Sequence, residues 1–181
     1  MNRKNVLYYL LALAAAFVIG CGGALLLRYI DAHEITPLEG GKAIDFADFG
    51  FAMNVPEDFR VFDETQASLD AGNDVLYAGT IGQGEDILHL YCYENAIGDD
   101  LSNHKAQDVV THYMSAGATE VRMRAFGGRP FICYRAEVVT EEGETQIWDS
   151  YETWNERVQI VFETQTAPDR VLPILATIFF H

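Results

Sequence analysis

Basic residues are scarce in this chain of 181 residues, which has 12 Lys and Arg against 27 Asp and Glu. Three of the basic residues, Arg3, Lys4 and Arg28, precede residue 29, whereas every acidic residue follows it, so residues 29–181 carry a net charge of −18. A surface of that sign repels phosphate backbones and anionic lipid headgroups. The sequence therefore predicts no nucleic-acid partner, and the charge suits solubility, a basic partner or the capture of a cation.

Cysteine is also scarce, and none of Cys21, Cys92 and Cys133 belongs to a CxxC pair. This excludes zinc-ribbon and thioredoxin-like motifs. Cys92 and Cys133 fall in apolar runs, which predicts buried thiols, with a disulfide between them as the alternative outside the cytoplasm. Nucleophile elbows, HExxH motifs and phosphate-binding glycine loops are missing too. We therefore expect no cofactor, no metal and no enzymatic activity, and a hydrolase ranks last among the functions considered.

Charge is absent from residues 6–27. As a helix this segment is about 33 Å long, enough to cross the hydrocarbon core of a bilayer. Arg3 and Lys4 precede it, which places the N-terminus in the cytoplasm and the rest of the chain outside. The alternative is a lipoprotein signal, because residues 18–21, VIGC, resemble a lipobox with Cys21 as the lipidated residue. Three leucines at 25–27 stand where a lipoprotein has a polar tether, which favours the uncleaved span.

Three regions follow from the patterning of the chain. Residues 1–28 form the anchor, and residues 29–44 mix charge with Pro37, Gly40 and Gly41, which indicates a linker. Residues 45–181 form the extracytoplasmic domain. There, short apolar or alternating segments predict strands, at 46–55, 59–62, 74–81, 86–94, 120–126, 130–140, 145–154 and 157–166. Turns of two to five residues between the later strands demand antiparallel pairing.

Two helices complete the predicted domain. Apolar residues at helical spacing predict one over 102–116, with Ser102 as N-cap and Gly117 just after its end. Pro168 permits a second helix to begin, and the spacing extends that helix to Ile178 and Phe179. The predicted fold class is therefore α+β, an antiparallel sheet with flanking helices.

A candidate partner-binding patch comes from the strand predicted at 145–154. Alternation places Trp148, Glu152 and Trp154 on one of its faces and Tyr151 on the other. Exposed aromatic side chains of this kind are typical of protein-binding surfaces, so Trp148, Tyr151 and Trp154 form the predicted patch. The alternative is that the tryptophans complete a core beneath a helix.

Two polar clusters are weak candidates for cation binding. His104, Asp108 and His112 are spaced four residues apart, but the first and last are about 12 Å apart along a helix, too far to share one ion. A solvated helix face is the better interpretation. Glu141, Glu142 and Glu144 form an acidic hairpin tip that lacks the ligand spacing of an EF-hand, which favours a solvated tip.

The opening of the domain has a recognisable pattern. Residues 49–59, FGFAMNVPEDF, together with GGRP at 127–130 and the helix after Pro168, resemble the PsbP-like α/β/α sandwich family, which includes bacterial lipoproteins and a Ran-binding nuclear import factor. The family usually has Trp where Phe59 stands. The resemblance covers residues 45–181 and implies a binding or assembly role. It carries over no catalytic residue, because the matching motifs contain none.

Together these observations predict a bacterial, membrane-anchored extracytoplasmic protein with a non-catalytic binding or assembly role. The expected partners are the membrane, through the N-terminal segment, and another envelope protein. The alternative is a small-ligand or metal-binding lipoprotein module that is lipid-anchored to the outer face of the membrane.

Overall fold

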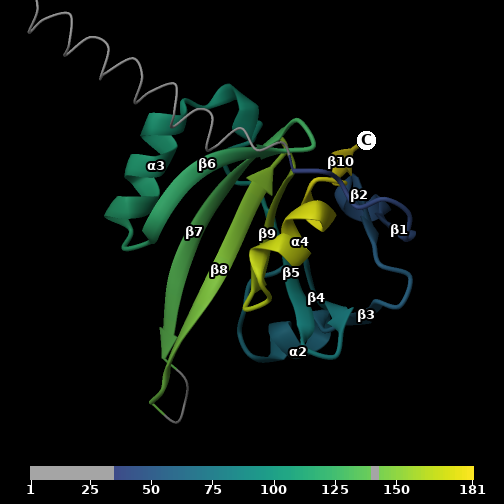
Figure 1. Cartoon of the computed structure of the whole chain (residues 1–181). Coiled ribbons are helices and arrows are strands. Elements are labelled where there is room, and N and C mark those ends of the chain that lie inside the picture. Colours follow the sequence, from purple (N-terminus) through teal and green to yellow (C-terminus); the bar gives the residue numbers. More distant parts are fainter. Residues whose placement is uncertain (1–34, 140–142) are drawn as a thin grey trace, which may run out of the picture. The chain divides into compact units, whose positions relative to one another are not determined.

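Seven antiparallel strands form one curved sheet in the computed structural model, which describes residues 35–139 and 143–181 (Figure 1). Their order across the sheet is β3 (Arg60–Asp63), β4 (Tyr77–Gln83), β5 (Asp86–Glu94), β9 (Val158–Thr164), β8 (Thr145–Trp154), β7 (Arg129–Val139) and β6 (Thr119–Phe126). Strand β9 comes late in the chain and pairs with β5 on one side and β8 on the other. It therefore joins two runs of strands, β3–β5 and β6–β8, into a single sheet.

The strand predictions were most accurate where tight turns bound the strands. Strands β5 and β8 begin and end where the sequence predicts them, and β7 differs from its prediction by one residue at each end. Gly127 and Gly128 connect β6 and β7 with φ angles of 55° and 80°. Residues other than glycine seldom adopt such backbone angles, so these two glycines fix the position of the hairpin.

A second, three-stranded sheet has the order β1 (Lys42–Phe46), β2 (Phe51–Val55), β10 (Phe179–Phe180). The short helix η1 (Ala47–Phe49) connects β1 and β2, and β2 ends before Pro56, which has no N–H to donate. The predicted linker over 29–44 differs from the structure at its C-terminal end. Residues 42–44 belong to β1, and the compact unit begins at Ile35, which packs with Leu38 against the core.

The main core lies where the small sheet and α4 (Pro168–Leu175) pack against one face of the large sheet. Its fully buried side chains include Phe51, Phe131 and Phe162. Cys92 and Cys133 are buried thiols in this core, as the apolar runs around them predict. Burial raises the pKa of Cys92 to about 12.

Helix α4 begins at Pro168, as predicted, but it ends at Leu175. The prediction that Ile178 and Phe179 extend this helix was therefore wrong. The N–H of Ile178 donates to the carbonyl of Leu175 in a tight turn, and Phe179 pairs with Ala52 in the small sheet. The pairing with β2 outweighs the helical spacing of the apolar residues, which is a weaker, local preference.

A smaller core lies on the other face of the large sheet, beneath α3 (Ala106–Ser115). It contains Leu101, Val109, Ile132 and Trp154. The helix predicted over 102–116 is divided in the structure, because η2 (Leu101–Asn103) precedes α3 and the two residues between them are extended. Asp100, rather than Ser102, caps η2 through its side chain. Gly117 follows α3 with φ 97°, as predicted.

The short helix α2 (Thr65–Asp70) follows β3 and was not predicted. No helix within residues 35–139 and 143–181 is long and apolar enough to cross a membrane. The predicted span over 6–27, Cys21, and the hairpin residues Glu141 and Glu142 lie outside the described residues.

Candidate binding surface on the large sheet

The three residues of the predicted aromatic patch do not share one surface. Tyr151 is buried in the main core, and Trp154 is buried in the small core, where its ring centre lies 5.9 Å from that of His104 with the two rings nearly perpendicular. The patch prediction was therefore wrong as a set, because alternation along β8 sends Tyr151 to the opposite face and the α3 region covers Trp154. Only Trp148 is partly exposed.

The predicted stripe of His104, Asp108 and His112 does not form on one helix. His104 has extended backbone angles and precedes α3, whereas Asp108 and His112 lie within it. Among the described residues, no three His, Cys, Asp or Glu side chains come together in a way that would hold a metal ion.

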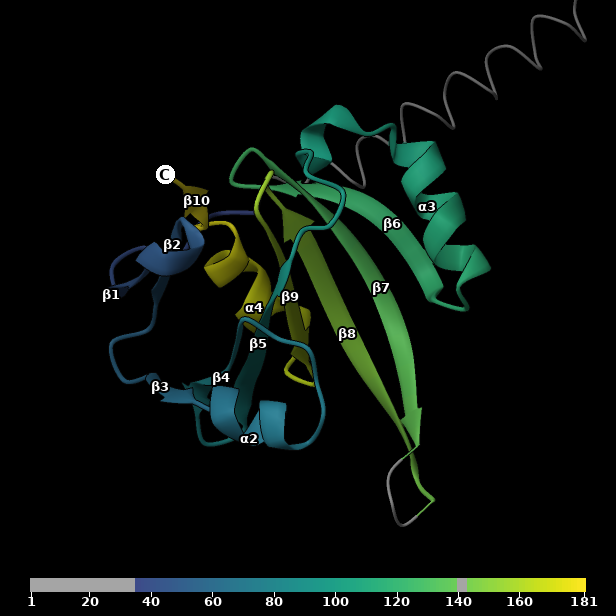
Figure 2. The ribbon, with the colours of Figure 1, turned by 180° about the vertical axis from the view of Figure 1, so that it is seen from behind.

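The sheet register instead brings a different set of side chains together. On the face that carries α3, Thr80, His89, Glu163 and Ser150 are successive cross-strand neighbours on β4, β5, β9 and β8. Helix α3 lies over the β6 end of this face and α2 lies near β3 and β4, and the middle strands are in view between them (Figure 2). Partly exposed side chains from these strands form a surface that we call the aromatic face, consisting of His89, Tyr91, Tyr93, Trp148 and Glu163.

The side chains of the aromatic face contact one another through their rings. The rings of Tyr91 and Tyr93 are nearly parallel, at 28°, with centroids 6.4 Å apart. The ring centroids of His89 and Trp148 are 5.3 Å apart, and Nδ1 of His89 lies 3.2 Å from the hydroxyl of Thr80. The pKa of His89 is lowered, chiefly by burial, which favours the neutral imidazole at pH 7.

Two hollows open beside these rings. One of about 100 Å³ is lined by Ile87, His89 and Trp148 together with Glu85 and the two residues that follow β9. The other, of about 320 Å³, is lined by residues of β3, β4 and the turn after β4, and it also reaches Ile87. The two hollows therefore adjoin at Ile87, on the face where the rings are accessible.

Two carboxyl groups, Glu152 and Glu163, lie on the middle strands of this region. Glu152 is 2% exposed and accepts hydrogen bonds from the hydroxyls of Tyr113 and Tyr134 and from the amide of Gln159. All three donors are neutral. Burial raises the pKa of Glu152 above its ordinary value, and these hydrogen bonds oppose the rise.

Glu163 pairs with Ser150 on the next strand and is a diagonal neighbour of Glu152. Burial raises the pKa of Glu163 as well, while the hydroxyl of Ser150 acts in the opposite direction. Neither glutamate forms an ion pair with a Lys or Arg of the described residues. The charge of Glu163 contributes to raising the pKa of Tyr91 and Tyr93, after burial, which is the larger cause. Carboxylates with perturbed pKa values and no cationic partner are features of functional sites.

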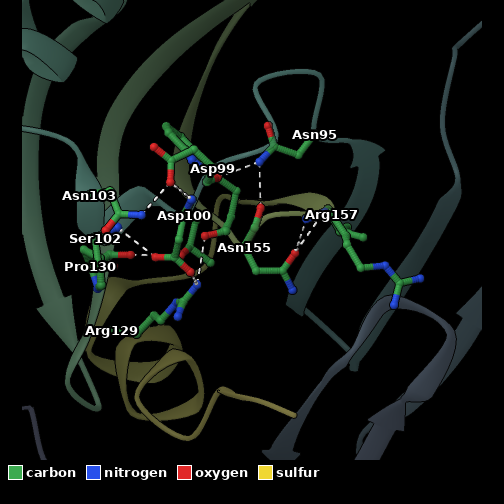
Figure 3. A network of polar contacts seen from close by, with 12 residues as sticks. Asn95, Asp99, Asp100, Ser102, Asn103, Arg129, Pro130, Asn155 and Arg157 are labelled. Carbon is green, nitrogen blue, oxygen red and sulfur yellow. Dashed lines mark hydrogen bonds and ion pairs between the residues drawn. The ribbon is translucent and has the colours of Figure 1, made fainter.

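A separate polar network lies around Asp100 and Arg129 (Figure 3). The guanidinium of Arg129 pairs with Asp100 at 2.6 Å, donates to the carbonyl of Trp154 at 2.8 Å and lies 3.9 Å from the ring centre of Phe180. Asn95 donates to the carbonyls of Asp99 and Asn155. The network connects the loop before η2, the β6–β7 hairpin, the end of β8 and the C-terminal strand, so we assign it a structural role.

Comparison with known proteins identifies the class of fold. An antiparallel sheet with helices on both faces is the PsbP-like arrangement, and the resemblance seen in the sequence is confirmed at the level of the fold. The chain is similar to the solution structure of cyanobacterial PsbP (CyanoP) from Synechocystis sp. PCC 6803, with a TM-score of 0.52 and 15% identity, over 77% of this chain and 92% of that one. No family model matches the sequence, and no curated protein matches it.

The sequence contains a signal for the aromatic face that the predicted patch did not use. His89, Tyr91 and Tyr93 alternate along β5 and therefore share one face. Glu163 is the one acidic residue of β9, whose other members are mostly apolar. Because Glu is seldom buried without a partner, its position in such a strand indicates a site.

Proposed function

We propose that this protein is a non-catalytic binding or assembly protein, held by its N-terminal segment at the outer face of a membrane, whose aromatic face contacts another protein. The observation that carries the proposal is the aromatic face itself. Tyrosine and tryptophan are enriched at protein–protein contacts, and here they surround an unpaired carboxylate on a partly exposed sheet. The PsbP-like fold supports a binding role of this kind.

Burial of the cysteines argues against catalysis by a thiol. A nucleophilic cysteine needs an accessible thiolate, usually with a lowered pKa. Cys92 is fully buried with its pKa raised to about 12, and Cys133 is buried in the same core. Neither side chain is therefore placed to attack a substrate.

The proposed location rests on the N-terminal sequence alone. The uncharged segment 6–27, preceded by Arg3 and Lys4, supports a span, and Cys21 supports lipid attachment as the alternative. The intact mass of the membrane-extracted protein distinguishes the two. We expect the full-length mass for a span, whereas loss of residues 1–20 with added lipid identifies a lipoprotein.

Site-specific photocrosslinking tests the partner contact. Benzoylphenylalanine replaces Trp148 or Tyr91 on the aromatic face of the full-length protein in its native membranes. Ile147 is the matched control, because it is 56% exposed and points to the opposite face from Trp148 on the same strand. We expect discrete crosslinked species from positions 148 and 91 and none from position 147. The same species from all three positions, or none from any, contradicts the proposal.

A small-ligand module is the second candidate, and the two adjoining hollows favour it. The larger hollow, at about 320 Å³, reaches the lower end of the range of ordinary ligand pockets. It is lined by Phe62 and Ile87 with the polar groups of Arg60, Thr80 and Gln83. An apolar wall with a few polar groups is the usual composition of such pockets. On this reading, position 148 would give no protein crosslink.

A further inference from the structure

The negative charge of the aromatic face has no counter-ion among the described residues. The ion pairs of the described chain use other acidic side chains, namely Asp45, Asp86, Asp99, Asp100, Glu120 and Asp149. Arg60 occupies the same face, but it lies on β3, three strands away from β9, which is about 14 Å at ordinary strand spacing. Glu163 therefore lacks a cation that the sheet itself would supply.

The groups around Glu163 favour an incoming cation. Glu152 is its diagonal neighbour on β8, and Glu64 accepts a hydrogen bond from the hydroxyl of Thr80, one strand beyond His89. The π-faces of tyrosine and tryptophan carry partial negative charge and attract cations placed over them. Glu163 pairs with His89 in the register, so Tyr91 is its diagonal neighbour on β5, and the ring of Tyr93 follows at 6.4 Å from that of Tyr91.

We propose that the aromatic face binds the guanidinium group of an arginine side chain presented by the partner, with Glu163 as its counter-ion and the rings of Tyr91 and Tyr93 beside it. This rests on the proposed function, since it names the chemistry of the partner. Residues 29–181 carry a net charge of −18, so an arginine-bearing segment is also attracted over distance.

Arginine fits this surface better than lysine for three physical reasons. Its guanidinium is planar and lies flat on aromatic rings, it donates to a carboxylate through two parallel N–H groups, and it is more weakly hydrated than an ammonium group. The surface combines flat rings with a carboxylate that is partly removed from water. A lysine side chain would pair with the carboxylate, but its ammonium group could not lie flat on the aromatic rings.

Nuclear magnetic resonance of the full-length protein in a non-ionic detergent tests the inference. The probes are an acetylated, amidated Gly-Gly-Arg-Gly-Gly peptide and the same peptide with citrulline, which has nearly the same shape and no charge. Trp148 and Trp154 are the two tryptophans of the chain. We expect the arginine peptide to shift the indole signal of Trp148 and leave that of Trp154, which is 5% exposed, unchanged. Citrulline should bind at least about tenfold more weakly, because it cannot form a charge-assisted hydrogen bond.

Two variants locate the site. Glu163→Gln should weaken the arginine peptide about tenfold, because it removes the counter-ion. Glu137→Gln is the control, because it removes the same charge from an exposed position on the opposite face of the same sheet. Its affinity should stay within about twofold of the wild type. Circular dichroism confirms that both variants are folded.

Three results overturn the inference: equal binding of the arginine and citrulline peptides, equal effects of the two variants, or no shift of Trp148 with any peptide. If crosslinks from positions 148 and 91 persist in that case, the protein-binding role stands and only the arginine chemistry is lost. If the arginine peptide binds but no protein crosslinks form, the face is a site for a small cationic ligand and the proposed protein contact is wrong.

Discussion

The ion pair between Arg129 and Asp100 gives the sharpest test of how the described domain is held together. Both side chains are about four-fifths buried, with exposed fractions of 21% and 19%. Burial acts to raise the pKa of Asp100, but hydrogen bonds from Ser102 and Arg129 outweigh it, so the pKa lies below its ordinary value. Arg129 also donates to a backbone carbonyl and lies over the ring of Phe180. One side chain therefore stabilises several segments.

Arg129→Met removes the charge and keeps most of the apolar stem. Removing one partner of a fully buried ion pair costs about 3–5 kcal/mol, and the residual exposure of this pair places the expected loss near the lower end, at about 3 kcal/mol. Asp100→Asn keeps an oxygen that accepts from the N–H of Ser102, so its loss should be smaller, about 2 kcal/mol.

Urea unfolding of the full-length protein in detergent, followed by tryptophan fluorescence, measures both losses and that of the double variant. Because the two side chains contact each other, we expect the double variant to lose about 1.5 kcal/mol less than the sum of the single losses. Arg135→Met is the control, because Arg135 pairs with Asp149 and Glu120 on the exposed surface. Additive losses, or an Arg129 effect as small as that of Arg135, would refute the structural role assigned to the network.

Two further predictions concern a buried charge and a tight turn. Because burial raises the pKa of Glu152, the protonated group stabilises the fold below its unfolded-state pKa, and this contribution is lost as pH rises through the folded-state pKa. Glu152→Gln should therefore flatten the decline of unfolding free energy as pH rises above about 4, and an unchanged slope in urea titrations would contradict this. Gly127→Ala places a Cβ 2.2 Å from the carbonyl oxygen of Ala176 at φ 55°, whereas Gly128→Ala at φ 80° meets no atom within 4 Å. We expect Gly127→Ala to cost about 3 kcal/mol and Gly128→Ala about 1 kcal/mol by thermal unfolding, and equal losses would show that the contact with Ala176 is unimportant.

The sequence predicted those elements whose signals are local. The side chains of β5 and β8 alternate between the two faces of the sheet, and turns rich in glycine or polar residues bound both strands. The ends of these strands therefore follow from residues in or next to them. The start of α3 was predicted wrongly because the side chain of Asp100 accepts a hydrogen bond from the N–H of Ser102 and caps η2. Asp100 and Ser102 are both good capping residues, and the spacing of the apolar residues does not show which of them caps a helix. Strand β10 has two residues and exists through pairing with β2, more than a hundred residues earlier, so no local pattern marks it.

The candidate site was harder to predict for a related reason. Alternation shows that His89, Tyr91 and Tyr93 share a face, but whether that face is covered depends on where α3 packs. The same packing buries Trp154, although its sequence neighbourhood resembles that of Trp148. The position of Glu163 between His89 and Ser150 depends on the pairing of β5, β9 and β8, and a single strand sequence does not show this pairing.

The central position of β9 has a consequence for biosynthesis. A growing polypeptide of about 155 residues contains two separate meanders, one ending with an unpaired β5 edge and the other with an unpaired β8 edge. Open edges of this kind invite pairing with other polypeptides. The newly made protein must therefore wait for residues 158–164 before these edges are sealed, and truncation ahead of β9 would leave the molecule prone to aggregation.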